Sequence, residues 1–492
     1  MKQTILFWHR RDLRFSDNLG LYAASQQNPR LVGVFCLDPG ILAREDLAPV
    51  RLAYLLECLP ELARRYRDAG GRLVLLRGAP QERIPALAQA LHAASVFWNE
   101  DVEPYSRRRD TEVEQVLRAS GTGVCRFWDQ LLHSPQELYT GSGQAYQVFG
   151  PFWRKWIRLP KPKPVGEPRG LESLLPSEWR AAQGEIPEML DPQTDCRSIR
   201  RQAGLNWKGD LPAAPGEAAS RQMLHEFMEN RIASYHTQRN FPAVAGTSGL
   251  SAAFHLGVLG IRTAWAASCR AERQSFSAGA SEGVQTWQQE LCWREFYQHA
   301  LWHFPGLADG AFRPGWDRFP WENREDLFHA WTRGETGFPM VDAAMRQLNS
   351  TGWMHNRCRM IVAAFLTKDL CIDWRWGEKY FMRHLADGDL AANNGGWQWS
   401  ASSGMDPKPL RIFNPCLQAG KYDPRGDYIR TYLPELGAVD ASLLISGNIP
   451  AGQRGNYPPP VVSHAQRQAE FRALYARWKS KLAPGVPGLS MA

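Results

Sequence analysis

The chain has 492 residues, of which 44% are hydrophobic and 22% charged, and its net charge is +8. This length suits two or three domains with large cores, and no apolar run is long enough for a membrane span. The apolar stretch within residues 1–15 is too short for a secretory signal peptide. We therefore expect a cytoplasmic protein whose basic charge favours a polyanionic partner.

Residues 1–133 alternate short apolar runs with longer amphipathic segments. The apolar runs, which are typical of buried strands, are 5–9, 31–38, 72–78, 95–101 and 123–129. Between them, 50–71 and 80–94 have the period of a helix. Strands that alternate with helices predict an α/β domain with a doubly wound parallel sheet. Neither a GxGxxG after the first strand nor a GxxxxGK[ST] is present, so we expect no dinucleotide fingerprint and no P-loop here.

Residues 134–215 differ in composition, with ten prolines between 150 and 215. We expect a long connector that follows the surface. From residue 216 to 482 the pattern predicts an all-α domain, and its clearest helix candidates are 217–236, 284–304, 339–350 and 356–370. The last segment, 483–492, has the composition of a disordered tail.

Metal and disulfide chemistry have weak support in this sequence. The nine cysteines occur singly and none forms a CxxC pair, which argues against a disulfide framework or a zinc site. His299 and His303 have the spacing of metal ligands on one helix face, but no HExxH accompanies them. We therefore expect no metal.

Tryptophan is concentrated in one part of the chain. Eleven of the 20 tryptophans lie between Trp287 and Trp399, among arginine, aspartate and asparagine. Indoles stack on flat ligands and lose an electron more easily than almost any other side chain, so this pattern indicates a planar redox cofactor, a nucleobase or both. An aromatic helical core would give the same composition.

Three motifs add chemistry to this composition. TSGLS (247–251) can direct hydroxyl and N–H groups at a phosphate, although a helix cap has the same residues. In WQQELCWREFY (287–297), one helix face carries a carboxylate, an indole and a guanidinium. DGDLAANNGGWQW (387–399) holds two acids, two amides and two indoles that cannot point the same way, while its NNGG is by itself typical of a surface turn.

These motifs, together with HRRDLRFSDN (9–18) and GWMHNRCRM (352–360), resemble the photolyase/cryptochrome flavoproteins. The resemblance extends past RIFNP (411–415) and is strongest to class I cyclobutane pyrimidine dimer DNA photolyases of the microbial, deazaflavin-antenna branch. It implies an N-terminal α/β antenna domain, a connector and a helical domain that holds FAD. It also implies light-driven repair of pyrimidine dimers, a lyase reaction, by electron transfer from excited, reduced FAD to a flipped-out dimer in UV-damaged DNA.

The resemblance assigns the FAD site residue by residue, with the reduced anionic flavin as the active form. The matching positions are Tyr235, Thr247, Ser248, Gly249, Leu250, Ser251, Arg359, Asp387, Asp389 and Asn393. Arg359 and Asp387 correspond to a buried pair beside the flavin, where charge favours the reduced anion. Asn393 corresponds to the residue that faces N5. An aspartate there, as in plant-like cryptochromes, can donate a proton, whereas an amide cannot.

Two further sets follow from the resemblance. Trp397, Trp374 and Trp321 match the electron-hopping triad that reduces oxidised flavin, while Trp331 is assigned to packing. The lesion pocket matches Glu290, Trp293, Asn356, Met360 and Trp399. The two indoles there would sandwich the dimer, and Glu290 would hydrogen-bond a thymine carbonyl. Relatives that repair (6-4) photoproducts carry a second histidine at the position of Asn356.

The remaining expectations concern DNA, the antenna and partners. Phosphate contacts are assigned to Arg239, Arg294, Arg357, Lys408 and Arg411. Phe35, Arg51 and Asp101 resemble an 8-hydroxy-5-deazaflavin site, but some relatives of that type carry a lysine at the position of His255. A folate, a flavin or an empty antenna pocket therefore stays open. We expect a monomer with no obligate protein partner and no membrane contact.

Three rival functions stay open at this point. A signalling cryptochrome is disfavoured by Asn393, Trp293, Met360 and the lack of a long C-terminal extension. A (6-4) photolyase is disfavoured by Asn356. An unrelated aromatic-rich RNA-binding protein would carry no flavin.

Overall fold

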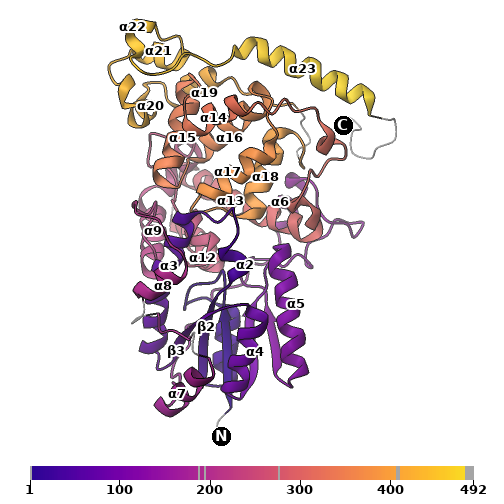
Figure 1. The fold of residues 1–492 in the computed structure, drawn as a ribbon, viewed down its shortest axis with the longest axis vertical. Coiled ribbons are helices and arrows are strands. Elements are labelled where there is room, and N and C mark those ends of the chain that lie inside the picture. The colour runs from indigo at the N-terminus through magenta and orange to yellow at the C-terminus, as the bar shows by residue number, and fades with distance from the viewer. Residues whose placement is uncertain (1–2, 187–188, 193–195, 275–277, 406–409, 483–492) are drawn as a thin grey trace. The chain divides into compact units, whose positions relative to one another are not determined.

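The computed structural model describes residues 3–186, 189–192, 196–274, 278–405 and 410–482. The chain forms two compact units, which Figure 1 labels by their helices and strands. Unit 1 comprises Met1–Ala233 and Ser248–Pro305, and unit 2 comprises Ser234–Thr247 and Gly306–Ala492. The expected disordered tail and Lys408 lie outside the described residues. The expected domain limits at 133 and 215 stay predictions.

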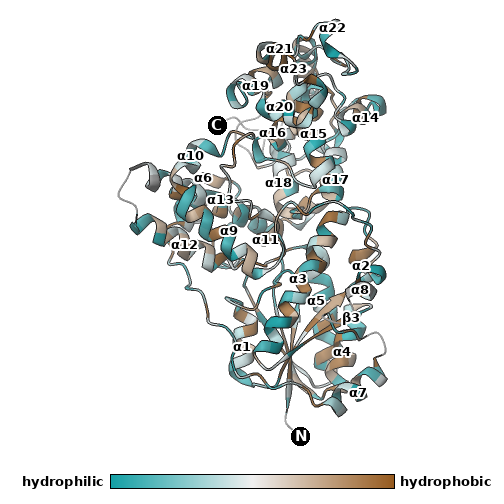
Figure 2. Ribbon diagram, turned by 90° about the vertical axis from the view of Figure 1, so that its left-hand side faces the viewer, coloured by the Kyte–Doolittle hydropathy of each residue, from teal (hydrophilic) through white to brown (hydrophobic). Residues whose placement is uncertain are grey.

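Unit 1 is built on a parallel five-stranded sheet with the order β3-β2-β1-β4-β5. The strands are β1 (Thr4–His9), β2 (Leu31–Leu37), β3 (Arg72–Arg77), β4 (Ala93–Asn99) and β5 (Gly123–Phe127). The strands β1 and β2 are buried along their whole length, as expected for strands that helices cover on both faces, whereas the edge strand β5 is mostly half-buried. Figure 2 shows hydrophobic stretches of the sheet in brown. The predicted α/β fold class and all five predicted strands are confirmed.

The helices around the sheet are α1 (Leu19–Gln27), α2 (Pro39–Leu42), α3 (Pro49–Asp68), α4 (Pro80–Ala90) and α5 (Pro104–Ala119). The last four begin with proline, whose fixed φ suits the first helical turn. The predicted connector contains three helices that its prolines obscured: α6 (Phe149–Trp156), α7 (Pro176–Glu185) and α8 (Cys196–Gln202). Unit 1 also contains α9 (Glu217–Asn230), α11 (Ser251–His255), α12 (Ile261–Gln274) and α13 (Ala278–His303).

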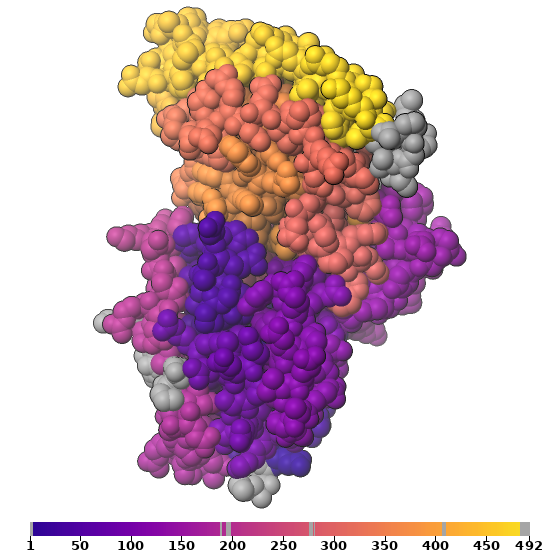
Figure 3. All heavy atoms as spheres, turned by 45° about the vertical axis from the view of Figure 1, so that its right-hand side comes forward, coloured from indigo at the N-terminus to yellow at the C-terminus, as the bar shows by residue number. Residues whose placement is uncertain are grey.

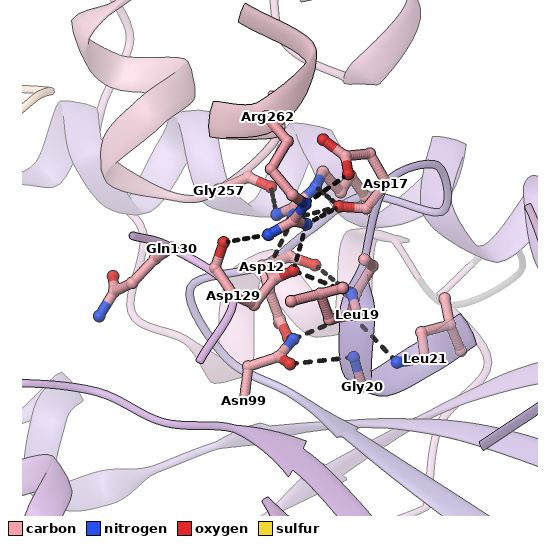
Figure 4. Close-up of polar contacts among 12 residues, drawn as sticks. Asp12, Asp17, Leu19, Gly20, Leu21, Asn99, Asp129, Gln130, Gly257 and Arg262 are labelled. Carbon is pink, nitrogen blue, oxygen red and sulfur yellow. Dashed lines mark hydrogen bonds and ion pairs between the residues drawn. The ribbon is translucent and has the colours of Figure 1, made fainter. Parts of the chain in front are cut away.

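A buried cluster of charges joins the sheet to α12 (Figure 4). Arg262 donates from Nε to Asp17 Oδ1 at 2.7 Å and from Nη2 to Asp129 Oδ1 at 2.6 Å. Arg14 donates to the other oxygen of Asp129. The four residues are each 3% exposed or less, and mutual pairing offsets their desolvation. Segments 133 residues apart in the chain are thereby fixed against one another.

Unit 2 is helical in the part of it that the structure describes. Its helices are α10 (Tyr235–Gln238), α14 (Glu325–Arg333), α15 (Pro339–Thr351), α16 (Asn356–Ala364), α17 (Trp374–His384), α18 (Leu390–Ala401), α19 (Pro415–Tyr422), α20 (Asp427–Tyr432), α21 (Ala441–Ser446), α22 (Ala451–Arg454) and α23 (His464–Lys481). Short helical turns are η1 (Ile232–Ser234), η2 (Pro305–Ala308), η3 (Trp316–Arg318) and η5 (Pro434–Leu436), and η4 (Phe365–Asp369) is a π-helical turn. None of the helices described in either unit is long and apolar enough to cross a membrane.

One apolar core holds unit 2 together, and Trp331, Trp374 and Trp397 lie inside it. A second cluster forms where Phe471, Tyr475 and Trp478 of α23 pack on Trp316. Figure 3 shows this C-terminal segment in yellow along one side of unit 2. The NNGG sequence at 393–396 is part of α18, so its alternative interpretation as a surface turn is wrong.

Candidate functional site

In unit 1, α13 presents the residues of the WQQELCWREFY motif. Glu290, Trp293 and Arg294 are each half-buried. The indole of Trp293 lies face to face with Phe149, with ring centroids 3.5 Å apart and planes inclined by 7°. Arg294 donates from Nη1 to the carbonyl oxygen of Gln130 at 2.8 Å, so its guanidinium also holds the chain of unit 1 in place.

The TSGLS segment forms a turn at the start of α11. Gly249 has φ of +69°, in the left-handed region where a side chain is strained, which explains the glycine. Leu250 occupies the N-cap position, and Ser251 is the first residue of α11. Thr247 belongs to unit 2. In that unit Tyr235 is buried, and the guanidinium carbon of Arg239 lies 5.3 Å from the centre of its ring.

The expected ion pair in unit 2 is present. Arg359 donates from Nη2 to Asp387 Oδ2 at 2.8 Å and to Oδ1 at 3.1 Å, and from Nε to the carbonyl oxygen of Met354 at 2.8 Å. The Asp387 side chain is 3% exposed and that of Arg359 is 25% exposed. The pair therefore places a buried carboxylate behind a guanidinium that reaches the surface of the unit.

The polar residues of DGDLAANN take two different roles at α18. Asp389 is the N-cap of this helix, where its carboxylate accepts from the N–H of Ala392 at 2.9 Å. Asn393 donates from Nδ2 to the carbonyl oxygen of Glu378 at 3.1 Å. Because the amide nitrogen faces Glu378, the Oδ1 atom of Asn393 is directed elsewhere, and it accepts no hydrogen bond from a residue that the structure describes.

The three tryptophans of the expected triad differ in their burial. Trp397 and Trp374 are each 2% exposed in the apolar core, and Trp321 is half-buried against it. The ring of Trp397 packs on Gly377, one helical turn after Trp374 in α17, where a Cβ atom would lie 2.1 Å from Trp397 Cη2. Trp331 donates its indole N–H to Val362, whereas that of Trp397 has no partner among the described residues.

At the start of α16, two neighbouring residues differ in burial: the side chain of one lies inside the protein and that of the other faces solvent. His355 is buried and caps the helix by accepting from the N–H of Arg357 at 3.1 Å. Burial, and then the nearby Arg359, lowers the pKa of His355 to about 4. Asn356 is exposed, and Met360, one turn later, is half-buried. The histidine is therefore a neutral structural cap, and the amide is the group open to a ligand.

The expected indoles of α18 diverge as predicted. Trp397 points into the core, and Trp399 is half-buried. The guanidinium carbon of Arg411 lies 4.8 Å from the centre of the Trp399 ring. Arg357 packs in the same manner over Tyr422, at 4.3 Å, and donates to Asn240 Oδ1 at 2.5 Å. These arginines are held against flat rings, a geometry that keeps their charge near the surface.

The expected antenna residues gather at the carboxyl ends of the strands, where ligands of doubly wound sheets bind. Phe35 lies in β2, Asp101 follows β4, and both are buried. Arg51 is buried as well, and burial lowers its pKa to about 10. Burial acts to raise the pKa of Asp101, but Arg11, Arg10 and the N–H of Glu103 together outweigh it, and the pKa falls below its ordinary value.

His255 belongs to the same cluster, because Arg11 donates to its carbonyl oxygen at 3.0 Å and lies 3.3 Å from its Nδ1. The two histidines at metal-ligand spacing have other partners. His299 and His303 each face a main-chain carbonyl oxygen, of His133 and Pro135 respectively. Within the described ranges no group of three or more metal-ligating side chains is present.

Sequence reasoning did not single out three residues near these side chains, although one of them, Glu295, is part of the WQQELCWREFY motif. Phe149 covers Trp293, Glu295 is a buried carboxylate two residues after it, and Lys368 is a fully buried amine that donates to Ala401 at the end of α18. In the sequence, the only pointer to Glu295 was its position two residues after Trp293. Phe149 and Lys368 come from other segments, and only the fold brings them there.

The chain matches two protein families of known type. Residues 5–169 match the family described as DNA photolyase, and residues 287–477 match the FAD binding domain of DNA photolyase. The chain is similar to a deoxyribodipyrimidine photo-lyase of Synechococcus sp., with 57% identity over 488 residues that cover 98% of each chain.

Solved structures give the same result for the fold. A bacterial class III photolyase from Agrobacterium tumefaciens matches with a TM-score of 0.84 and 35% identity, over 98% of each chain. An archaeal photolyase from Sulfolobus tokodaii, described with two FAD molecules, matches with a TM-score of 0.81 and 28% identity, over 96% of this chain and 100% of that one.

Proposed function

Because the chain belongs to the DNA photolyase family, we propose that it is a deoxyribodipyrimidine photo-lyase, a carbon–carbon lyase that splits cyclobutane pyrimidine dimers in DNA under light. The observation that carries this proposal is the match over nearly the whole chain to a protein of that name. Held in its reduced form by the residues named below, FAD would supply light-driven electron donation to a flipped-out dimer, with the electron returned after ring opening and no net redox change.

The side chains of the expected FAD site fit such a cofactor. The open Oδ1 of Asn393 can accept a hydrogen bond from a flavin N–H but cannot protonate it. Arg359, partly exposed in its pair with Asp387, would favour a reduced, anionic flavin. Pyrophosphate and ribityl contacts are proposed for Tyr235, Thr247, Ser248, Gly249, Leu250 and Ser251, with Asp389 fixing the start of α18.

Contacts with the lesion are proposed for the residues that the resemblance assigned to it. Trp293 and Trp399 offer half-buried rings to the flat bases, and Glu290 offers a carboxyl group. A dimer stacks poorly, so flipping it out of the duplex costs less than flipping normal bases. With His355 committed to capping α16, Asn356 and Met360 meet the lesion without a histidine for acid–base work. This arrangement favours the cyclobutane dimer over the (6-4) photoproduct.

Phosphate contacts are proposed for Arg239, Arg294, Arg357, Lys408 and Arg411. Such contacts position DNA without reading its sequence, which suits an enzyme that acts wherever damage occurs. We also propose that the protein is a cytoplasmic monomer that needs no protein partner. Size-exclusion chromatography of the free protein and of its complex with DNA tests the oligomeric state.

For the antenna, we propose 8-hydroxy-5-deazaflavin at the carboxyl ends of the strands, held by Phe35, Arg51 and Asp101. The buried guanidinium of Arg51 suits an acidic chromophore. The archaeal structure with two FAD molecules makes a second FAD the alternative. Identifying the chromophores released from the purified protein tests this proposal. One deazaflavin and one FAD per chain would support it, and two FAD molecules per chain would favour the alternative.

Illumination of the purified protein with dimer-containing DNA, against a dark control, tests the activity. We expect a visible flavin spectrum and a light-dependent loss of dimers, with no repair of DNA that carries only (6-4) photoproducts. A flavin-containing protein that leaves dimers intact under light would instead be a blue-light-sensing cryptochrome.

A further inference from the structure

The stacking of Phe149 on Trp293 is unusually complete. Aromatic pairs prefer offset or edge-to-face arrangements to a direct face-to-face sandwich, yet these ring centroids are 3.5 Å apart at an angle of 7°. Phe296 lies nearly perpendicular to both rings, at 5.9 Å and 80° from Phe149 and at 5.7 Å and 85° from Trp293. The neighbouring structure therefore imposes this geometry on the pair.

The position of Phe149 is fixed by the way α6 is attached to α13. Phe152, one turn after Phe149, is fully buried against Phe296 and His299. At the end of α6, Trp156 donates from Nε1 to Glu295 Oε1 at 2.8 Å. Buried partners on the same helix that carries Trp293 thus hold the middle and the C-terminal end of α6.

Phe149 covers one face of the Trp293 indole, and the ring of Tyr297 also packs near it, with centroids 5.6 Å apart and planes inclined by 30°. The Trp293 side chain is still only half-buried, which leaves part of it accessible to a ligand. We propose that Phe149 is a positioning residue, which fixes the Trp293 ring from behind so that its opposite face receives the dimer. This inference rests on the proposed function, in which Trp293 contacts the lesion.

The Trp293 ring is therefore fixed in position before DNA binds. Fixing a side chain on binding costs about 0.5–1.5 kcal/mol, which corresponds to roughly a 2- to 12-fold change in Kd. The sequence offers a direct way to remove the stacking while keeping apolar volume, Phe149→Leu, and a conservative variant that keeps the ring, Phe149→Tyr.

The test measures binding of the full-length protein to a short duplex with one cyclobutane dimer and to the undamaged duplex. For Phe149→Leu we expect a Kd for the damaged duplex roughly 3- to 10-fold higher, with unchanged binding to undamaged DNA and unchanged photoreduction of oxidised flavin. Phe149→Tyr should bind like the wild type. Phe127→Leu, which removes a ring stacked on Phe97 within the sheet, is the matched control.

A Trp293→Ala background separates positioning from general structure. If Phe149 acts through the indole, Phe149→Leu has no further effect on dimer binding in that background. Should Phe149→Leu fail to fold, Phe149→Met carries the same comparison. Tighter or unchanged dimer binding by the leucine variant would overturn the inference, because Phe149 would then occupy the place of a base or be dispensable. A wild-type protein that does not prefer damaged DNA would instead refute the proposed function.

Discussion

The two units bury charge in different ways. In unit 1, the buried Arg262 forms ion pairs with the buried carboxylates of Asp17 and Asp129. In unit 2, Lys368 is fully buried and donates to the carbonyl oxygen of Ala401 at 2.7 Å, and burial lowers its pKa to about 7. This cluster in unit 1 satisfies buried charge by pairing, whereas burial favours the neutral, deprotonated form of Lys368 in unit 2.

This difference reflects what each unit must hold in place. Paired charges satisfy each other in a single arrangement, so the cluster of unit 1 determines which distant segments meet. The apolar core of unit 2 accepts many large rings for its stability, and among them the indoles are the proposed carriers of electrons. We therefore expect pairing to have its main effect on folding in unit 1, and the identity of the rings in unit 2 to have its main effect on function.

Breaking the charge cluster should have the largest effect on stability. Arg262→Met leaves Asp17 and Asp129 buried without this partner, and we expect the free energy of unfolding of unit 1 to fall by about 3–5 kcal/mol. Urea-induced unfolding measures the change. Arg333→Met, which breaks the exposed pair with Glu335, is the control and should cost under about 1 kcal/mol. Equal effects of the two variants would contradict the comparison.

Unit 1 also contains the buried carboxyl group of Glu295, which accepts hydrogen bonds from N–H groups and forms no ion pair with an arginine or lysine among the described residues. Burial raises the pKa of Glu295 from 4.5 to about 7, against three N–H donors that lower it. Between these values the folded protein keeps a proton that the unfolded chain has released. The contribution of Glu295 to stability is thus complete below pH 4.5 and is lost as the pH rises through about 7, by about 3 kcal/mol.

Glu295→Gln removes this proton equilibrium. The free energy of unfolding of the wild type minus that of the variant should fall steadily between pH 5 and pH 8. Titrating groups that Glu295 does not influence cancel in this difference. Lys161, whose pKa burial lowers to about 8 and Glu295 raises, titrates at the upper end of the range, so the fall is read below pH 7. The neighbouring His299, whose pKa burial lowers to about 3, stays neutral throughout the range. A difference that does not vary with pH would show that Glu295 keeps one protonation state.

The sequence predicts the fold better than it predicts these buried groups. The five strands follow from apolar runs, and the helices α13, α15 and α16 from periodicity. Helix α6 escapes prediction because prolines dominate its surroundings, and the NNGG segment is helical because packing outweighs local preference. Charges such as Asp129 and Arg262 are indistinguishable from surface charges until the fold brings them together.

In the candidate site, too, some residues could be predicted from the sequence and others could not. The resemblance supplied Arg359 with Asp387, and the structure contains that ion pair. It supplied Trp293 but not Phe149, since a contact between α6 and α13 is invisible in either segment alone. The roles of the individual site residues toward flavin and DNA stay predictions.

Crowding the ring of Trp397 tests how tightly the apolar core of unit 2 is packed. A Cβ atom at Gly377 would lie 2.1 Å from Trp397 Cη2, so Gly377→Ala forces the indole to move. We expect a loss of about 1–3 kcal/mol, although alanine favours a helix by up to about 1 kcal/mol over glycine. Gly184→Ala, in α7 with open space around it, is the control and should be neutral or stabilising. Thermal unfolding of both variants gives the answer, and a stabilised Gly377→Ala would be inconsistent with this packing.

Trp321→Phe should have the smallest effect on stability and still alter function. The residue is half-buried, so a smaller ring is tolerated. We expect photoreduction of oxidised flavin to slow strongly, while repair by chemically reduced protein is preserved.

Trp331→Phe is the matched control: Trp331 is fully buried and donates to Val362 at 3.1 Å, so its replacement should lower stability and leave photoreduction intact. Transient absorption and a repair assay on the same preparations separate the two outcomes. If Trp321→Phe abolished repair by reduced protein as well, the indole would belong to the repair step itself, and the distinction between rings that pack and rings that pass electrons would have to be redrawn.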